Sequence, residues 1–258
     1  MTLLTLTRHG TPGSATKLLI VHGLFGSGRN WGAIAKRLSD RGEVLAVDMR
    51  NHAGSFWSGV HDYPAMAADL AAVIEAEGAP MDVLGHSMGG KAAMLLALTR
   101  PDRVRRLVVA DIAPVAYGHS QTHLIAAMRG MDLTNLSTRA EADRRLAQTV
   151  ADPQVRAFLL QSLDLRADPP TWRLNLDVLE ARMDGITGWV DDTALPPFPG
   201  PALFLAGALS DYVRPEARPT IRRLFPQARL ARIPGAGHWL HAEKPREFEA
   251  AVRVFLSA

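Results

Sequence analysis

The chain has 258 residues, of which 47% are hydrophobic, and its mean hydropathy is close to zero. This length and composition suit one α/β domain with a substantial core and exclude a largely disordered chain. Its 29 basic residues only slightly outnumber its 26 acidic ones, so the short arginine clusters at 103–106 and 222–223 indicate solvated helix ends rather than a nucleic-acid site.

Alternating and apolar runs predict seven strands separated by helical patterns. The strands are expected near 2–8, 17–22, 43–48, 81–86, 106–111, 201–207 and 228–233. The helices between and after them are expected near 30–39, 64–77, 88–99, 215–225 and 245–257. Apolar strand centres such as 18–21 and 107–110 suit a mostly parallel sheet with helices on both faces.

The stretch from about 115 to 195 interrupts this alternation, because it contains helical patterns and no comparable strand. Helices are expected at 121–130, 138–149, 153–163 and 170–183, as a cap inserted between a core of residues 1–114 and 196–258. Met128, Phe158 and Trp172 in this cap, together with Trp239, are candidates for lining an acyl pocket. For each of the first three taken alone, packing inside the cap is the favoured explanation.

Location is predicted from what the sequence lacks. The first residues have no basic region followed by a long apolar core, so we expect no signal peptide. No apolar run approaches the ~20 residues of a membrane span. The chain has no cysteine, which excludes disulfides, thiol nucleophiles and thiolate metal sites and fits the cytoplasm. Whether the protein is a monomer or a dimer stays open.

The segment Gly85-His86-Ser87-Met88-Gly89 predicts a catalytic nucleophile. It joins a β-rich run to the helix-forming run 91–98, and a serine in such a sharp turn is exposed at a helix N-terminus. The turn leaves no room for side chains two positions before and after the serine, which explains both glycines. Three fixed positions recur by chance, but this strand–turn–helix setting is specific.

A serine nucleophile requires a base, and His238 is the candidate. It lies in Gly235-Ala236-Gly237-His238, after the predicted strand 228–233 and before the last helix. A glycine-containing loop at this place allows an imidazole to point back over the sheet. His241, three residues later, is expected to be a loop or helix-entry residue.

Oxyanion donors are expected from His22-Gly23-Leu24-Phe25-Gly26, which closes the strand 17–22. A glycine-containing turn there exposes backbone N–H groups, so Leu24 and Met88 are the expected donors, with Phe25 as the alternative to Leu24.

The acid that orients the histidine has more than one candidate. Asp111 ends the strand 106–111, Asp211 follows the strand 201–207, and Asp177 lies on a predicted cap helix as a weaker third choice. Asp111 is preferred because it stands directly at its strand end, although a turn-capping role also fits it.

These residues resemble the α/β-hydrolases of the small YbfF-type carboxylesterase group. The resemblance spans nearly the whole chain and is carried by 21–27, 48–52, 85–98, 111–115, 172–175 and 236–245. It implies an α/β-hydrolase fold, Asp111 as the acid, and hydrolysis of esters or thioesters without a metal or an organic cofactor. Two positions depart from the group. Ala53 stands where a glycine is usual, so its loop is expected to be reshaped, and Asp211 is an unusual acidic residue that leaves open a second carboxylate near His238.

The expected function is therefore hydrolysis of a small-molecule acyl ester or thioester through an acyl-enzyme on Ser87. C–C bond hydrolysis and cofactor-free perhydrolysis use the same residues and stay open. A dehalogenase is disfavoured because it would carry a carboxylate in place of Ser87. A ligand-binding protein on a hydrolase fold would be expected to lack part of the triad.

Overall fold

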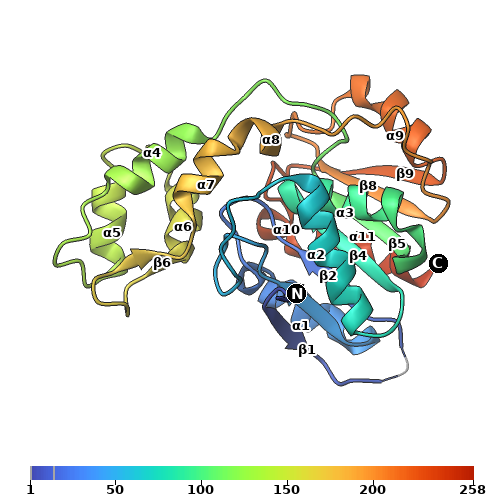
Figure 1. Cartoon of the computed structure of the whole chain (residues 1–258), viewed down its shortest axis with the longest axis horizontal. Coiled ribbons are helices and arrows are strands. Elements are labelled where there is room, and N and C mark those ends of the chain that lie inside the picture. Colours follow the sequence, from blue (N-terminus) through green and yellow to red (C-terminus); the bar gives the residue numbers. More distant parts are fainter. Residues whose placement is uncertain (1, 14) are drawn as a thin grey trace.

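The computed structural model describes residues 2–13 and 15–258, and a seven-stranded sheet forms its centre (Figure 1). The strand order is β1-β3-β2-β4-β5-β8-β9; β1 is antiparallel to β3 and all the other neighbours are parallel. The strands are β1 (Leu6–His9), β2 (Leu18–Val21), β3 (Val44–Val47), β4 (Met81–His86), β5 (Val104–Ala110), β8 (Ala202–Gly207) and β9 (Ala228–Ile233). All seven predicted strands are present, so the mostly parallel sheet is confirmed.

Helices cover both faces of the sheet. One face carries α1 (Gly32–Leu38), α10 (Leu240–Glu243) and α11 (Pro245–Ser257), and the other carries α2 (Tyr63–Ala76), α3 (Met88–Thr99) and α9 (Arg218–Leu224). Strand β2 shows why. Leu18 and Ile20 belong to the buried cluster on the face of α1, α10 and α11, whereas Leu19 and Val21 belong to the cluster on the face of α2, α3 and α9. Side chains alternate across a strand, and both sets here are apolar, so this sheet is buried on both sides.

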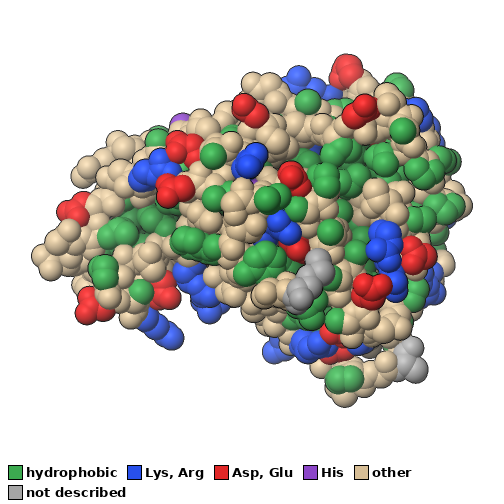
Figure 2. All heavy atoms as spheres, viewed as in Figure 1, with side chains coloured by type: hydrophobic (Ala, Val, Ile, Leu, Met, Phe, Trp, Pro, Cys, Tyr) green, Lys and Arg blue, Asp and Glu red, His purple; other side chains and the backbone are tan. Residues whose placement is uncertain are grey.

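Between β5 and β8 the chain forms a lobe on one side of the core, at the left of Figure 1. This cap contains α4 (Thr122–Gly130), α5 (Arg139–Leu146), α6 (Pro153–Leu159), α7 (Leu176–Ala181), α8 (Met183–Thr187) and the short pair β6 (Leu163–Asp164) and β7 (Thr171–Trp172). Short 3-10 turns are η1 (Gly28–Trp31), η2 (Ser39–Arg41), η3 (Pro101–Arg103), η4 (Leu160–Ser162) and η5 (Pro215–Ala217). On the face seen in Figure 2, hydrophobic side chains alternate with charged ones over both lobe and core.

The prediction of one helix over 170–183 is wrong in its first part. Residues 171–172 form a strand, Leu174 forms an isolated antiparallel bridge with His52, and α7 begins only at Leu176. Tertiary hydrogen bonds explain the difference: Arg173 N–H donates to Ser162 O (2.8 Å), and Arg173 O accepts from Ala53 N–H (2.7 Å). Within residues 2–13 and 15–258, none of the helices is both long and apolar enough to cross a membrane.

Candidate active site

Ser87 lies in the sharp turn between β4 and α3. Its backbone has φ 51° and ψ −123°, a strained conformation for a residue other than glycine. A Cβ on Gly85 would lie 2.4 Å from Gly89 O, and one on Gly89 would lie 2.3 Å from His22 O, so neither position tolerates a side chain. The turn therefore holds the Ser87 hydroxyl at the N-terminus of α3, where the helix dipole favours negative charge.

His238 lies in the loop after β9 and faces Ser87. Its Nε2 is 3.1 Å from Ser87 Oγ, and its Nδ1 is 2.7 Å from Asp111 Oδ2. The ring of Tyr212 stacks on the imidazole, with ring centroids 3.9 Å apart and planes inclined by 17°. Hydrogen bonding and stacking together fix the imidazole between the hydroxyl and the carboxylate.

Asp111, at the end of β5, is fully buried and is held by two further donors. Its Oδ1 accepts from Gly207 N–H at 2.9 Å, and its Oδ2 accepts from the Ser210 hydroxyl as well as from His238. Three hydrogen-bond donors fix the orientation of this carboxylate, which in turn fixes the orientation of His238.

The other candidate acids do not reach the histidine. The Asp211 side chain is 88% exposed and lies 3.7 Å from Arg214, and the Asp177 side chain pairs with Arg129 on the cap surface. Although Asp211 is adjacent to Ser210 and Tyr212, it points to solvent while both neighbours contact the Asp111–His238 pair.

Two backbone N–H groups in the residues around Ser87 have no acceptor within the described part of the chain. Among the hydrogen bonds of the described residues, none uses Leu24 N–H or Met88 N–H, and both residues line the cavity beside Ser87. Phe25 N–H, the alternative donor, instead donates to His52 Nε2 at 3.2 Å. The geometry therefore favours Leu24 and Met88 as the oxyanion donors.

A cavity of about 320 Å³ lies between the sheet edge and the cap and includes Ser87 and His238. The rings of Phe158, from the cap, and Trp239, from the core, lie 5.4 Å apart in its wall. The remaining lining is mostly apolar or aromatic and includes Leu24, Trp31, Tyr63, Met88, Ile112, Tyr117, Leu124, Val155, Ile186 and Tyr212. Such a wall suits the apolar part of a small substrate.

Met128 and Trp172 are not part of that lining. Met128 is fully buried within the cap, and Trp172 Nε1 donates to Met128 O at 2.8 Å. Their positions are explained by packing of α4 against β7, not by contact with a ligand. Apolar residues of a small cap have similar sequence patterns in both roles, so the sequence carried no signal that separated them.

Lys91 is a buried cation that links α3 to the end of the cap. Its Nζ donates to Thr187 O at 3.0 Å and to Gly188 O, and lies 4.6 Å from the centroid of the Tyr117 ring. Burial lowers the pKa of Lys91 to about 7. The carbonyl oxygens and the ring take the place of water around this charge. Sequence reasoning assigned no role to Lys91, although it follows the glycine pair of the nucleophile turn.

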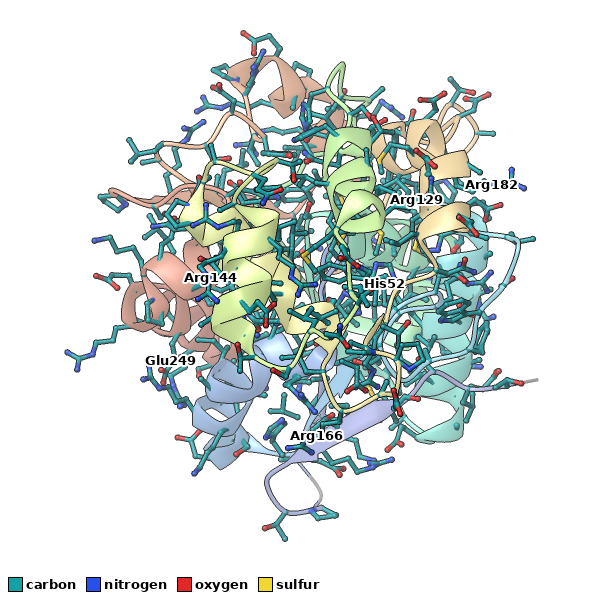
Figure 3. The ribbon with its side chains drawn as sticks, turned by 90° about the vertical axis from the view of Figure 1, so that its left-hand side faces the viewer. His52, Arg129, Arg144, Arg166, Arg182 and Glu249 are labelled. Carbon is teal, nitrogen blue, oxygen red and sulfur yellow. The ribbon has the colours of Figure 1, made fainter. Side chains whose placement is uncertain are left out.

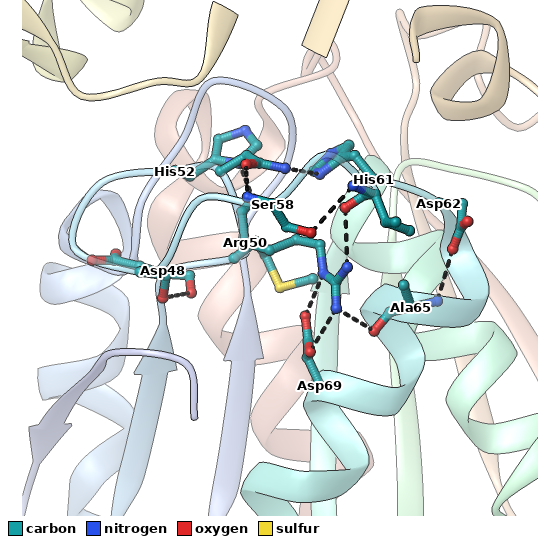
Figure 4. A network of polar contacts seen from close by, with 12 residues as sticks. Asp48, Arg50, His52, Ser58, His61, Asp62, Ala65 and Asp69 are labelled. Carbon is teal, nitrogen blue, oxygen red and sulfur yellow. Dashed lines mark hydrogen bonds and ion pairs between the residues drawn. The ribbon is translucent and has the colours of Figure 1, made fainter. Parts of the chain in front are cut away.

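The loop of residues 48–61, between β3 and α2, is held by a buried polar network (Figure 4). Arg50 donates to both carboxylate oxygens of Asp69, at 2.6 and 2.8 Å, and to Val60 O at 3.0 Å. Ala53 has a φ of 46°, a left-handed conformation that glycine adopts at lower cost. Ala53 therefore has a backbone conformation suited to glycine, at the position where the sequence departs from the group that it resembles.

Comparison with known proteins agrees with this architecture. A family model described as the alpha/beta hydrolase fold matches residues 17–245. The chain is 43% identical over 249 residues to the sn-1-specific diacylglycerol lipase ABHD11 of Mus musculus, covering 93% of this chain and 80% of the relative. It is 40% identical over 243 residues to esterase YbfF of Escherichia coli, covering 93% and 92% of the two chains.

A solved structure entitled marine microorganism esterase superposes with a TM-score of 0.93 at 38% identity, covering 99% of this chain and all of the other. The chain therefore belongs to the α/β-hydrolase family and is a carboxylesterase-type hydrolase within it.

Proposed function

We propose that the protein hydrolyses carboxylic esters in two steps through an acyl-enzyme on Ser87. The observation that supports this most directly is the continuous row Ser87 Oγ, His238 and Asp111, with separations of 3.1 and 2.7 Å. A hydroxyl within hydrogen-bond reach of a histidine, itself oriented by a carboxylate, is the arrangement that activates serine as a nucleophile.

In the first step, Ser87 Oγ attacks the ester carbonyl carbon while His238 Nε2 takes the hydroxyl proton. The negative oxygen of the tetrahedral intermediate accepts hydrogen bonds from Leu24 N–H and Met88 N–H. The intermediate then collapses, His238 protonates the departing alkoxide, and an alcohol leaves.

In the second step, a water molecule gives its proton to His238 and attacks the acyl carbon. The bond to Ser87 Oγ then breaks, Oγ regains the proton, and a carboxylic acid is released. Asp111 accepts the Nδ1–H of His238 throughout and stays ionised.

The proposed substrate is a small-molecule ester whose apolar acyl group occupies the cavity beside Phe158 and Trp239. Thioesters present the same acyl carbon to Ser87, so acyl-CoA compounds belong to the same proposal. The names of the two relatives, a diacylglycerol lipase and an esterase, both describe ester hydrolysis in those proteins.

The experiment that tests this proposal combines covalent labelling with a substrate series. A fluorophosphonate should add to Ser87, and Ser87→Ala should abolish the labelling and lower kcat by a factor on the order of 10⁶, with an unchanged circular dichroism spectrum. Comparing kcat/KM for acyl esters and acyl-CoA thioesters of increasing chain length then identifies the preferred substrate. Undiminished ester hydrolysis by Ser87→Ala would refute the acyl-enzyme.

A further inference from the structure

The peptide groups around Phe25 form a hydrogen-bonded path from the cap to the proposed oxyanion donor. The Ser162 hydroxyl, in η4 of the cap, donates to Phe25 O at 2.7 Å. The same peptide group carries Gly26 N–H, which donates to Gly23 O at 3.0 Å. The peptide group of Gly23 O in turn carries Leu24 N–H. Because the C=O and N–H of one trans peptide point in opposite directions, fixing Gly23 O fixes the direction of Leu24 N–H.

Phe25 itself requires this support. Its φ is 63°, a left-handed conformation that costs a bulky side chain about 1–2 kcal/mol. Such a conformation persists only where its surroundings determine it, and it is common at active sites. Here both polar groups of the residue are held, because Phe25 N–H donates to His52 Nε2 and Phe25 O accepts from Ser162.

His52 is suited to this role because it stays a neutral acceptor. Its Nδ1–H donates to Arg50 O (2.9 Å), which leaves the Nε2 lone pair for Phe25 N–H. Burial, and to a smaller extent the neighbouring His22, lower the pKa of His52 to about 3. In the side view of Figure 3, His52 lies behind the helices of the cap.

The cap is also bonded to the loop of residues 48–61, which carries His52. Ala53 N–H donates to Arg173 O at 2.7 Å, and Asn175 N–H donates to Asn51 O at 3.0 Å. Ser162 O accepts from Arg173 N–H, so the same cap segment binds the loop and supplies the hydroxyl that holds Phe25. Displacing the cap would therefore remove the Ser162 donor from Phe25 O and the backbone bonds that hold the loop carrying His52.

We propose that packing of the cap against the core positions the oxyanion hole. Ser162 and His52 are the positioning residues: they hold the Phe25 peptide and thereby direct Leu24 N–H at the substrate. This inference rests on the proposed acyl transfer at Ser87. Its consequence is that a loosened cap leaves Ser87, His238 and Asp111 intact but weakens stabilisation of the tetrahedral intermediate. Successive hydrogen bonds along the path polarise one another, so the cap hydroxyl also strengthens the final donor.

The test compares Ser162→Ala and His52→Leu with Arg139→Met. Arg139 holds the same turn from inside the cap, donating to Ala157 O at 2.7 Å and to Leu160 O at 3.2 Å, and among the described residues it makes no hydrogen bond to Phe25 or to the core, so its loss does not release the cap from the core. Loss of a whole oxyanion donor lowers kcat by about 10²–10³, so misdirecting one of two should lower it by roughly tenfold. KM should change by less than about twofold, because the ground state makes weaker use of these donors.

A second readout separates this effect from general loosening. A trifluoromethyl ketone adds to Ser87 as an oxyanion, whereas the matching methyl ketone binds without forming a stable adduct. Ser162→Ala should weaken binding of the fluorinated ketone by the same roughly tenfold factor and leave binding of the methyl ketone unchanged. The thiol of Ser162→Cys has a similar volume and is a weaker donor, so kcat and ketone binding of this variant should lie between those of wild type and Ser162→Ala. This variant takes the place of Ser162→Ala if the alanine variant does not fold.

Equal losses in Ser162→Ala and Arg139→Met, or unchanged kcat in both Ser162→Ala and His52→Leu, would overturn the inference. Either outcome leaves the proposed function in place as long as Ser87 is labelled by a fluorophosphonate. Failure of that labelling would instead reject the acyl-enzyme itself.

Discussion

Replacing Asp111 by Asn should inactivate the protein without changing its shape. Asp111 is fully buried, and its Oδ2 lies 2.7 Å from His238 Nδ1. An amide of the same size keeps an oxygen for Gly207 N–H but can present NH₂ to the imidazole. The histidine then carries its proton on Nε2 and can no longer accept one from Ser87, which costs up to ~10⁴ in kcat.

Asp211→Asn is the matched control, because it makes the same chemical change one residue from Ser210. The Asp211 side chain is 88% exposed and its only ion pair is a surface contact of 3.7 Å with Arg214 among the described residues. Such pairs contribute little, so kcat should change less than about tenfold. Both variants are assayed on a chromogenic ester, with thermal melting as the check on folding. A crippled Asp211→Asn beside an active Asp111→Asn would refute the assignment, and similar partial losses would indicate that the two carboxylates share the histidine.

Three further outcomes are expected. Ser210→Ala removes one donor from the Asp111 carboxylate and should lower kcat by roughly threefold to tenfold, with Ser210→Thr restoring it; full activity in the alanine variant would show that the contact is dispensable. Ala53→Gly should raise the free energy of unfolding by about 0.5–1 kcal/mol in urea titrations because its φ is 46°, and a lower value would mean that the loop carries no strain. Burial lowers the pKa of His22 to about 4 and that of His52 and His61 to about 3, below the value of roughly 6.5 in an unfolded chain. The unfolded state therefore binds protons that the native state does not, and stability should fall as the pH drops from 6.5 towards 4, by up to about 1.4 kcal/mol per histidine per pH unit; equal urea midpoints at pH 7.5 and 5.5 would contradict this.

Local pattern was sufficient for the sheet and for the turn at Ser87. Strand periodicity and the spacing of Gly85 and Gly89 are properties of neighbouring residues, and the structure shows the close backbone contacts that require those glycines. The sequence favours Asp111 but leaves Asp211 open, because the direction of a side chain in a loop depends on what the loop packs against. It does not predict the role of Ser210, because a single serine near a strand end has no distinguishing pattern.

The cap shows the same limit at the level of secondary structure. Residues 170–183 have a helical pattern, but Ala53 N–H donates to Arg173 O and Arg173 N–H donates to Ser162 O, and these bonds keep the first part out of a helix. The contact with Ala53 joins segments more than a hundred residues apart, and the contact with Ser162 joins two parts of the cap; together they override local preference there. The same contacts of Arg173 take part in the proposed control of the oxyanion hole. The segment of the cap whose structure the sequence predicts least well is therefore the segment to which we assign an effect on catalysis.

The chain enters and leaves the cap at adjoining points, since Tyr117 N–H donates to Thr187 O at 3.0 Å. The lobe is thus a loop closed at its base, and a replacement of different length can be joined there without moving β5 or β8. We expect exchange of this lobe between relatives to change the substrate range while the central sheet is kept. A donor lobe for such chimaeras should be chosen first for a hydroxyl above Phe25 and only then for the shape of its pocket.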